Sequence, residues 1–98
     1  MEAWRVFITP AADRVVKKLP AEARKFVENE FPSLIRQNPL AGFALASPLD
    51  WLRSFHFSAD GKPYRIAYAI DTKTHKIYIH YADYRGHFYK NLRNILRK

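Results

Sequence analysis

The fold is decided by the stretch from Lys62 to Lys98, which reads KPYRIAYAIDTKTHKIYIHYADYRGHFYKNLRNILRK. Its segment Tyr64–Ile70 alternates aromatic or Ile residues with Arg or Ala, the period-two pattern of a strand with one face in the core. The segment Lys76–Ala82 is apolar on both faces, which predicts a strand in the interior of a sheet. A C-terminal helix follows, with Asp83 as its expected N-cap. The stretch therefore predicts two strands and a helix.

The two faces of the first of these strands differ. One face carries aromatic and Ile side chains and is predicted to fill the core. On the other face Arg65 stands beside the small residues Ala67 and Ala69, and we expect a shallow groove above the two alanines. The helix that follows also has two faces, with Tyr89 at their boundary. Its apolar face carries Phe88, Leu92, Ile95 and Leu96, and its basic face carries Lys90, Arg93 and Arg97.

The chain before this stretch is predicted to be scaffold. Residues Trp4–Ile8 are rich in strand formers, and Thr9 followed by Pro10 is a helix start, because proline needs no N–H at the first helical position. Apolar residues at helical spacing predict a second helix over residues 21–38. Pro32 lies inside that pattern and predicts a kink or a break, since it removes a backbone hydrogen bond. The two helices are expected to form a hairpin that covers the sheet.

A loop and a further strand complete the scaffold. Residues Leu40–Asp50 contain Pro, Gly and Ser but also large apolar residues, so we expect a loop that wraps the edge of the core. Residues Trp51–Phe57 alternate in character and predict the first strand of a hairpin. Asp60 and Gly61 supply its turn.

Length and composition exclude several classes of protein. The 98 residues suit a single domain, residues 1–98, with one core. The sequence has neither a signal-peptide pattern nor an apolar run long enough to span a membrane, so a cytoplasmic protein is expected. It contains no cysteine, and its four histidines lack the spacing of a zinc motif. No metal and no cofactor are therefore expected.

The charge is divided unevenly along the chain. Residues 1–50 carry seven Lys or Arg against six Asp or Glu, whereas residues 51–98 carry ten against three. A basic excess concentrated in one half points to a polyanionic partner, which could be nucleic acid or an acidic protein. A generic solvated surface is the plainer interpretation.

Several residues of the basic half could carry chemistry. Arg65 on its strand and Arg85 at the start of the helix could converge on one phosphate. Cleaving RNA without a metal also requires a base and an acid, and histidine is the more natural base, because tyrosine would need neighbouring cations to lower its pKa. The catalytic candidates are Arg65, Arg85, His87 and Tyr89. The candidates for RNA binding are Arg53, His56, Lys62, Lys90 and Arg93.

The sequence resembles the RelE/ParE superfamily of toxins from type II toxin–antitoxin systems. The resemblance rests on Tyr64–Tyr68, Ile77–Ala82 and Tyr84–Tyr89, and it extends over nearly the whole chain. It implies an α+β fold in which a four-stranded, mainly antiparallel sheet carries an N-terminal helical hairpin on one side and a C-terminal helix. Where RelE-type toxins often have Lys or Arg in the second strand, this chain has Ser54 and His56.

The resemblance also implies roles. Arg65 matches the strand arginine that stabilises the scissile phosphate, Arg85 matches an arginine before the last helix, and Tyr89 matches a tyrosine proposed to assist proton transfer. A RelE-like toxin would be a hydrolase, an mRNA endoribonuclease that acts on the ribosome and inhibits translation. A ParE-like toxin would instead inhibit DNA gyrase without catalysis. Either would be silenced by an acidic antitoxin in a hetero-oligomeric complex. A nucleic-acid-binding domain without toxicity is the remaining alternative.

Overall fold

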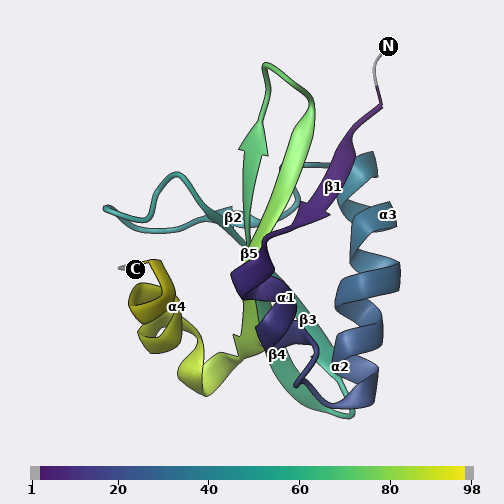
Figure 1. The fold of residues 1–98 in the computed structure, drawn as a ribbon, viewed down its shortest axis with the longest axis vertical. Helices are drawn as coiled ribbons and strands as arrows, with labels where there is room; N and C mark the ends of the chain where they lie inside the picture. The colour runs from purple at the N-terminus through teal and green to yellow at the C-terminus, as the bar shows by residue number, and fades with distance from the viewer. Residues whose placement is uncertain (1–2, 97–98) are drawn as a thin grey trace.

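A mixed five-stranded sheet forms the centre of the protein, whose computed structural model describes residues 3–96 (Figure 1). The strand order is β1-β5-β4-β3-β2; β1 runs parallel to β5 and the other neighbours are antiparallel. The predicted α+β class is confirmed, but the prediction of a four-stranded sheet is wrong. The additional strand, β2, has two residues and lies within the segment expected to be a loop. The strands are β1 (Arg5–Ile8), β2 (Phe43–Ala44), β3 (Arg53–Ala59), β4 (Lys62–Asp71) and β5 (Lys76–Tyr84).

The helices are also more divided than expected. The hairpin consists of α1 followed by three consecutive helical segments, and a 3-10 turn precedes the C-terminal helix. Thr9 caps α1 as predicted, since its side chain accepts a hydrogen bond from the backbone N–H of Ala12 at 3.2 Å. The segments are α1 (Pro10–Val16), α2 (Ala21–Lys25), the π-helical η1 (Phe26–Glu30), α3 (Phe31–Gln37), the 3-10 turn η2 (Arg85–His87) and α4 (Phe88–Leu96).

The irregularity predicted at Pro32 is a widened turn rather than a break. The backbone N–H of Phe31 donates to the carbonyl of Phe26, five residues earlier, which is the hydrogen bond of a π helix. Pro32 has no N–H for the ordinary α-helical bond, and the wider turn accommodates its ring while the helix continues to Gln37.

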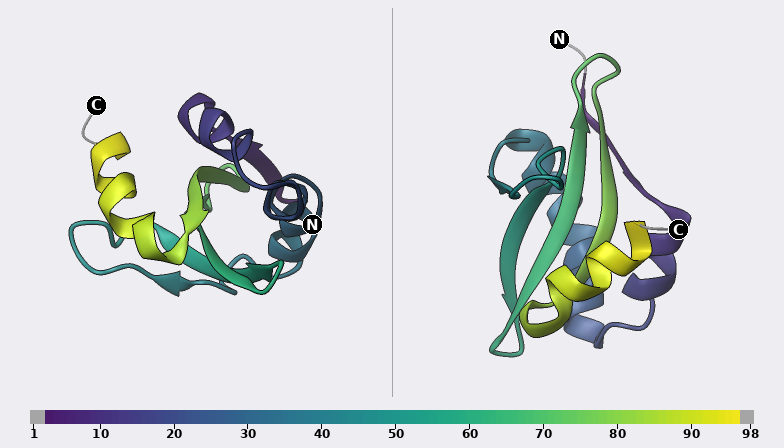
Figure 2. Two further views of the ribbon diagram at one scale, coloured as in Figure 1. Left: turned by 90° about the horizontal axis from the view of Figure 1, so that it is seen from below. Right: turned by 90° about the vertical axis from the view of Figure 1, so that its left-hand side faces the viewer.

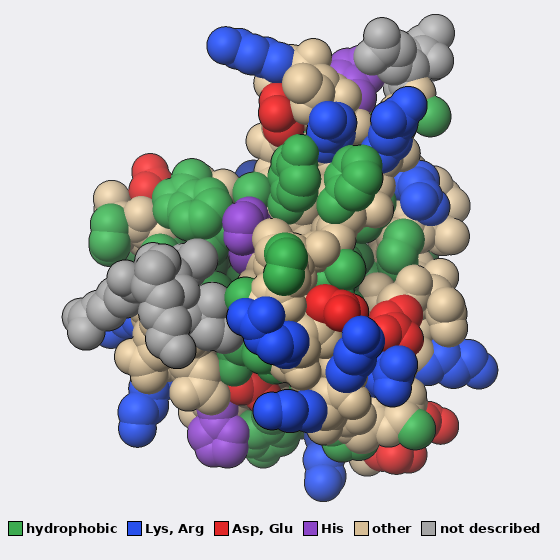
Figure 3. Space-filling view, in the orientation of Figure 1, with side chains coloured by type: hydrophobic (Ala, Val, Ile, Leu, Met, Phe, Trp, Pro, Cys, Tyr) green, Lys and Arg blue, Asp and Glu red, His purple; other side chains and the backbone are tan. Residues whose placement is uncertain are grey.

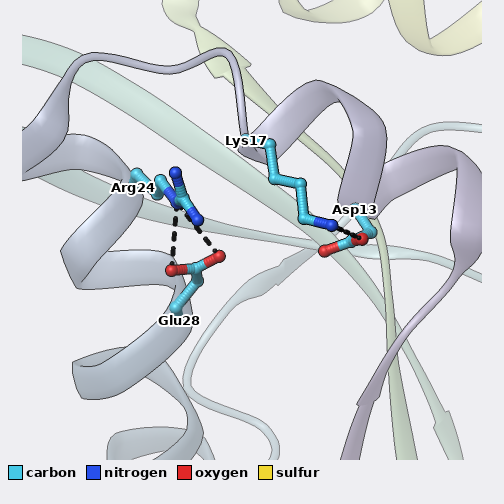
Figure 4. Close-up of polar contacts among 4 residues, drawn as sticks. All are labelled: Asp13, Lys17, Arg24 and Glu28. Carbon is cyan, nitrogen blue, oxygen red and sulfur yellow. Dashed lines mark hydrogen bonds and ion pairs between the residues drawn. The ribbon is translucent and has the colours of Figure 1, made fainter.

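Two exposed ion pairs lie on the surface of the N-terminal helices. Lys17 pairs with Asp13 at 2.9 Å, and Arg24 pairs with Glu28 at 3.2 Å (Figure 4). Both join residues one helical turn apart and face solvent, so each contributes only a few tenths of a kcal/mol, about 0.3–0.5. These helices are held to the sheet by their apolar contacts instead.

The sheet has a core on each face. Buried side chains of α1, α2, η1 and α3 pack against one face, and α4 covers part of the other. Figure 2 shows the N-terminal helices in purple and blue and α4 in yellow. Phe88 and Leu92 of α4 belong to the same buried cluster as Ala67. The groove expected above Ala67 and Ala69 is therefore filled by the helix. The side chains of Ile95 and Leu96, and Arg97 itself, lie outside the described residues.

The segment between α3 and β3 is pinned to the sheet by a buried tyrosine. The hydroxyl of Tyr68 donates to the carbonyl of Pro39 at 2.8 Å and accepts a hydrogen bond from the N–H of Gly42 at 2.9 Å. A Cβ on Gly42 would lie 2.7 Å from the carbonyl oxygen of Ser54 and 2.8 Å from the hydroxyl of Tyr68. The close packing explains glycine there, and the segment wraps the core edge as predicted.

Asp83 does not cap the last helix. Strand β5 continues through Tyr84, and the carboxylate of Asp83 accepts hydrogen bonds from the Tyr81 hydroxyl, the Asn91 side chain at 3.1 Å and the Tyr84 N–H at 2.7 Å. Burial, followed by the hydrogen bond and charge of Asp83, raises the pKa of Tyr81, so its hydroxyl stays protonated. Asp83 thus links β5 to α4.

In the described part of the chain, no helix is long and apolar enough to cross a membrane.

Candidate functional site

Arg65 and Tyr89 meet on the face of the sheet that carries α4. Arg65 lies in β4, and Tyr89 lies in the first turn of α4. The guanidinium of Arg65 donates a hydrogen bond to the Tyr89 hydroxyl at 2.8 Å and lies 5.3 Å from the centre of the tyrosine ring. The tyrosine side is open, with 41% of the residue exposed. The contact brings a fixed cation and a hydroxyl together at the surface.

His56 lies beside this pair. It is the direct neighbour of Arg65 across the β3–β4 pairing. Partial burial, followed by the positive charges of Arg65 and Arg85, lowers the pKa of His56 below its ordinary value of 6.5. The imidazole is therefore mostly neutral at pH 7 and can accept a proton. The positive charge of Arg85 therefore acts on His56. Within residues 3–96, Arg85 forms no hydrogen bond with His56, Arg65 or Tyr89.

A cavity of about 570 Å³ opens next to Tyr89. One wall is the segment of residues 44–49, and the other is α4 through Tyr89 and Arg93. Tyr89 therefore belongs to both features, because its hydroxyl contacts Arg65 while the residue lines the cavity. The lining residues are Ala44, Leu45, Ala46, Ser47, Pro48, Leu49, Tyr89 and Arg93.

Two predicted site residues lie apart from this pair. The ring of His87 packs 5.9 Å from the ring of Tyr84, and in the described structure His87 makes no hydrogen bond or ring contact with Arg65 or Tyr89. Lys62 lines a different hollow, together with Leu19 and Tyr84. Lys62 is three residues from Arg65 along β4, and side chains at that spacing point to opposite faces of a strand.

Arg53 has a structural contact instead of a free guanidinium. Its Nη2 donates hydrogen bonds to the carbonyls of Leu40 and Gly42, so it holds the segment that leads into β2. This contact gives Arg53 a structural role, and the expectation that Arg53 binds RNA stays a prediction. Lys90 is exposed on α4 and, within the described residues, forms no hydrogen bond or ion pair.

Lys and Arg side chains do not gather into one patch on the face drawn in Figure 3, and acidic side chains lie among them. On this face the Lys and Arg side chains are thus spread over the surface. Within residues 3–96, no group of three or more His, Asp or Glu side chains is arranged to hold a metal ion. At Arg65 and Tyr89 the groups present are a cation and a hydroxyl.

A family model described as a ParE-like toxin of type II bacterial toxin–antitoxin systems matches residues 6–93. The chain belongs to this family. The resemblance to the RelE/ParE superfamily is thereby confirmed, and the protein is a toxin of the type II class. No functionally curated protein matches the sequence significantly.

Solved structures of RelE toxins share this toxin's fold. The RelBE2 toxin–antitoxin complex of Mycobacterium tuberculosis contains a chain that is 28% identical, with a TM-score of 0.72 over 87% of this chain and 94% of that one. A mutant of Escherichia coli RelE in the free state is 10% identical, with a TM-score of 0.73 over 95% and 93%. The RelE–RelB complex of Pyrococcus horikoshii gives 22% identity and a TM-score of 0.53 over 87% and 98%. At the two lower identities the likeness concerns the fold alone.

The sequence did not single out Phe43 or residues 44–49 as part of the toxin's site. Phe43 is 71% exposed, and its ring lies 6.0 Å from the ring of His56. The available signal was the apolar character of residues 40–49, which was interpreted as packing. Leu45 does pack in the core, but Phe43 lies against His56, and Ala44, Ala46 and Ser47 line the cavity.

Proposed function

We propose that this toxin is a RelE-like mRNA endoribonuclease that cleaves RNA on the ribosome and so inhibits translation. The observation that carries the proposal is the 2.8 Å contact between Arg65 and Tyr89, with His56 beside Arg65 in the sheet. The three side chains supply a cation for the phosphate, a hydroxyl and a base within one small area. The fold shared with RelE structures supports the same proposal.

The proposed reaction is attack of the RNA 2′-oxygen on the adjacent phosphorus, with loss of the 5′-oxygen. His56 takes the proton of the 2′-hydroxyl, a role that suits an imidazole whose pKa is lowered. Arg65, assisted by Arg85, stabilises the negative charge that grows on the phosphate oxygens. Because the Tyr89 hydroxyl accepts from Arg65, its own proton remains available to the leaving 5′-oxygen.

Induced expression in a bacterial host, with primer extension on translated mRNAs, tests this proposal. We expect Arg65→Ala to lower cleavage by about 10² to 10³-fold, the usual effect of removing one group that stabilises transition-state charge. Tyr89→Phe keeps the ring and should lower cleavage by at least about 10²-fold through loss of the proton donor. Arg14→Gln, an exposed change on α1, is the matched control. Full cleavage by both site variants would refute the assignment.

Gyrase inhibition is the second candidate function, favoured by the ParE-like description of the matching family. A non-catalytic inhibitor needs a binding surface but no proton donor, so Tyr89→Phe should leave it toxic. A supercoiling assay with purified gyrase separates the two functions. Inhibition by the unmodified toxin, with mRNA left intact, would decide for gyrase.

We also propose an acidic antitoxin as partner, in a hetero-oligomeric complex. Two of the similar structures are toxin–antitoxin complexes, and the second half of this chain has a large positive excess that an acidic segment could neutralise. Purification of the tagged toxin from its own operon should yield a second, acidic protein encoded beside it. Recovery of the toxin alone would contradict the proposal.

A further inference from the structure

We infer that the cavity between α4 and residues 44–49 is a subsite for one nucleobase of a single-stranded RNA whose backbone lies at Arg65. The inference rests on the proposed function and adds to it where the substrate's base is held. It gives the cavity one occupant, an unstacked base.

The position of Tyr89 connects the cavity to the phosphate site. Its hydroxyl contacts Arg65 at 2.8 Å, and the same residue lines the cavity. A nucleotide joins a phosphate to a base through one sugar, so a strand with its phosphate at Arg65 has a neighbouring base at Tyr89. The open recess that Tyr89 lines lies next to that position.

The composition of the walls suits a base. Arg93 is one helical turn after Tyr89 and lies on the same side of α4, so a ring and a guanidinium border the cavity together. Both groups stack on the faces of bases, and such stacking tolerates any base. The opposite wall is formed mainly by aliphatic groups of Leu45, Pro48 and Leu49. The volume of about 570 Å³ lies within the usual range of ligand pockets.

Charge favours RNA over a neutral apolar ligand. Of the residues described as lining the cavity, Arg93 is charged and none is acidic. Arg65 adds a second cation beside Tyr89. A neutral ligand would gain nothing from these charges, whereas the phosphates flanking a bound base would. The recess between two walls also requires a base that is free of its partner, which excludes a duplex.

Filling the cavity tests the inference in the cleavage assay. Ala46 is exposed and lines the cavity, so Ala46→Trp should occupy the space without disturbing the core. Ala41→Trp places the same side chain at an exposed position outside the cavity and is the matched control. We expect Ala46→Trp to lower cleavage at least about tenfold, the loss of one stacked base, and to alter the preferred sites. Arg93→Gln, compared with Arg14→Gln, repeats the test should the tryptophan variant fail to fold.

Binding measured by NMR keeps this inference separate from the proposed activity. The probes are a single-stranded RNA pentanucleotide, its abasic counterpart and benzene, each added to the full-length toxin. Signals of Ala44 and Ala46 should shift with the RNA and much less with the abasic strand. That result with no mRNA cleavage would support the subsite and refute the ribonuclease. Equal shifts with the abasic strand, shifts with benzene alone, or unchanged cleavage by Ala46→Trp in an active toxin would overturn the subsite.

Discussion

Replacing Tyr68 by phenylalanine should destabilise the toxin without changing the volume of its core. Tyr68 is completely buried, and its hydroxyl is the bridge between β4 and the segment that follows α3. Phenylalanine keeps the ring and its edge-on contact with Phe31, whose centroid lies 5.5 Å away. The substitution therefore removes only the hydrogen bonds to Pro39 and Gly42.

The cost of Tyr68→Phe follows from those two bonds. Each is worth about 1 kcal/mol net, and a buried N–H left without a partner costs about 1–3 kcal/mol. The N–H of Gly42 is in a buried position, so the total should be about 2–3 kcal/mol. In a domain of this size that corresponds to a fall in Tm of roughly 10–20 °C.

Urea unfolding followed by circular dichroism measures this loss. Tyr78→Phe is the matched control, because Tyr78 lies in the neighbouring strand and, within residues 3–96, its hydroxyl forms no hydrogen bond. The control should change the free energy of unfolding by less than about 0.5 kcal/mol. If Tyr68→Phe were no less stable than Tyr78→Phe, the hydroxyl would not anchor the segment and our account of it would be wrong.

Further substitutions test the fold and the site. Gly42→Ala should lower the free energy of unfolding by about 1–3 kcal/mol in the same urea assay, because its Cβ would collide with backbone and with Tyr68. Asp83→Ala should cost about 2–3 kcal/mol, since it removes three hydrogen bonds to a charged acceptor, and a loss below 0.5 kcal/mol would argue against the link to α4. Arg65→Gln should raise the pKa of His56 in an NMR titration, and an unchanged value would contradict the coupling. Because the pKa of His56 is lowered on folding, the unfolded chain takes up the proton first and stability falls as pH drops below about 6.5.

Local patterns in the sequence were sufficient for most of the fold. The alternation of Tyr64–Ile70 placed Tyr68 in the core and Arg65 on the opposite face, and the interior position of β5 followed from its apolar residues. Strand β2 could not be predicted in this way, because two residues carry no periodicity. Gly42, the residue before β2, donates a hydrogen bond to the Tyr68 hydroxyl and accepts one from Arg53, and neither residue is close to it in sequence.

The misplaced Asp83 has a related cause. The pairing of β4 with β5 shifts by one residue, since Ala67 pairs with Tyr81 whereas Tyr68 pairs with Ile79. The extra residue is a β-bulge, and β5 continues past Asp83 to Tyr84. Aspartate is a common helix N-cap, so the sequence alone favours a helix start at Asp83 over a longer strand.

The candidate site combines what a single strand encodes with what only the folded chain brings together. The face on which Arg65 lies could be predicted from the alternation in β4. The same period-two rule places Lys62 on the opposite face. The cavity was not predictable, because one wall belongs to α4 and the other to residues 44–49. Tyr68, on the opposite face of β4 from Arg65, anchors the start of the segment that leads to this wall. Tyr68→Phe should therefore alter both stability and the preferred cleavage sites, whereas Arg65→Ala should lower cleavage by about 10² to 10³-fold with little effect on stability.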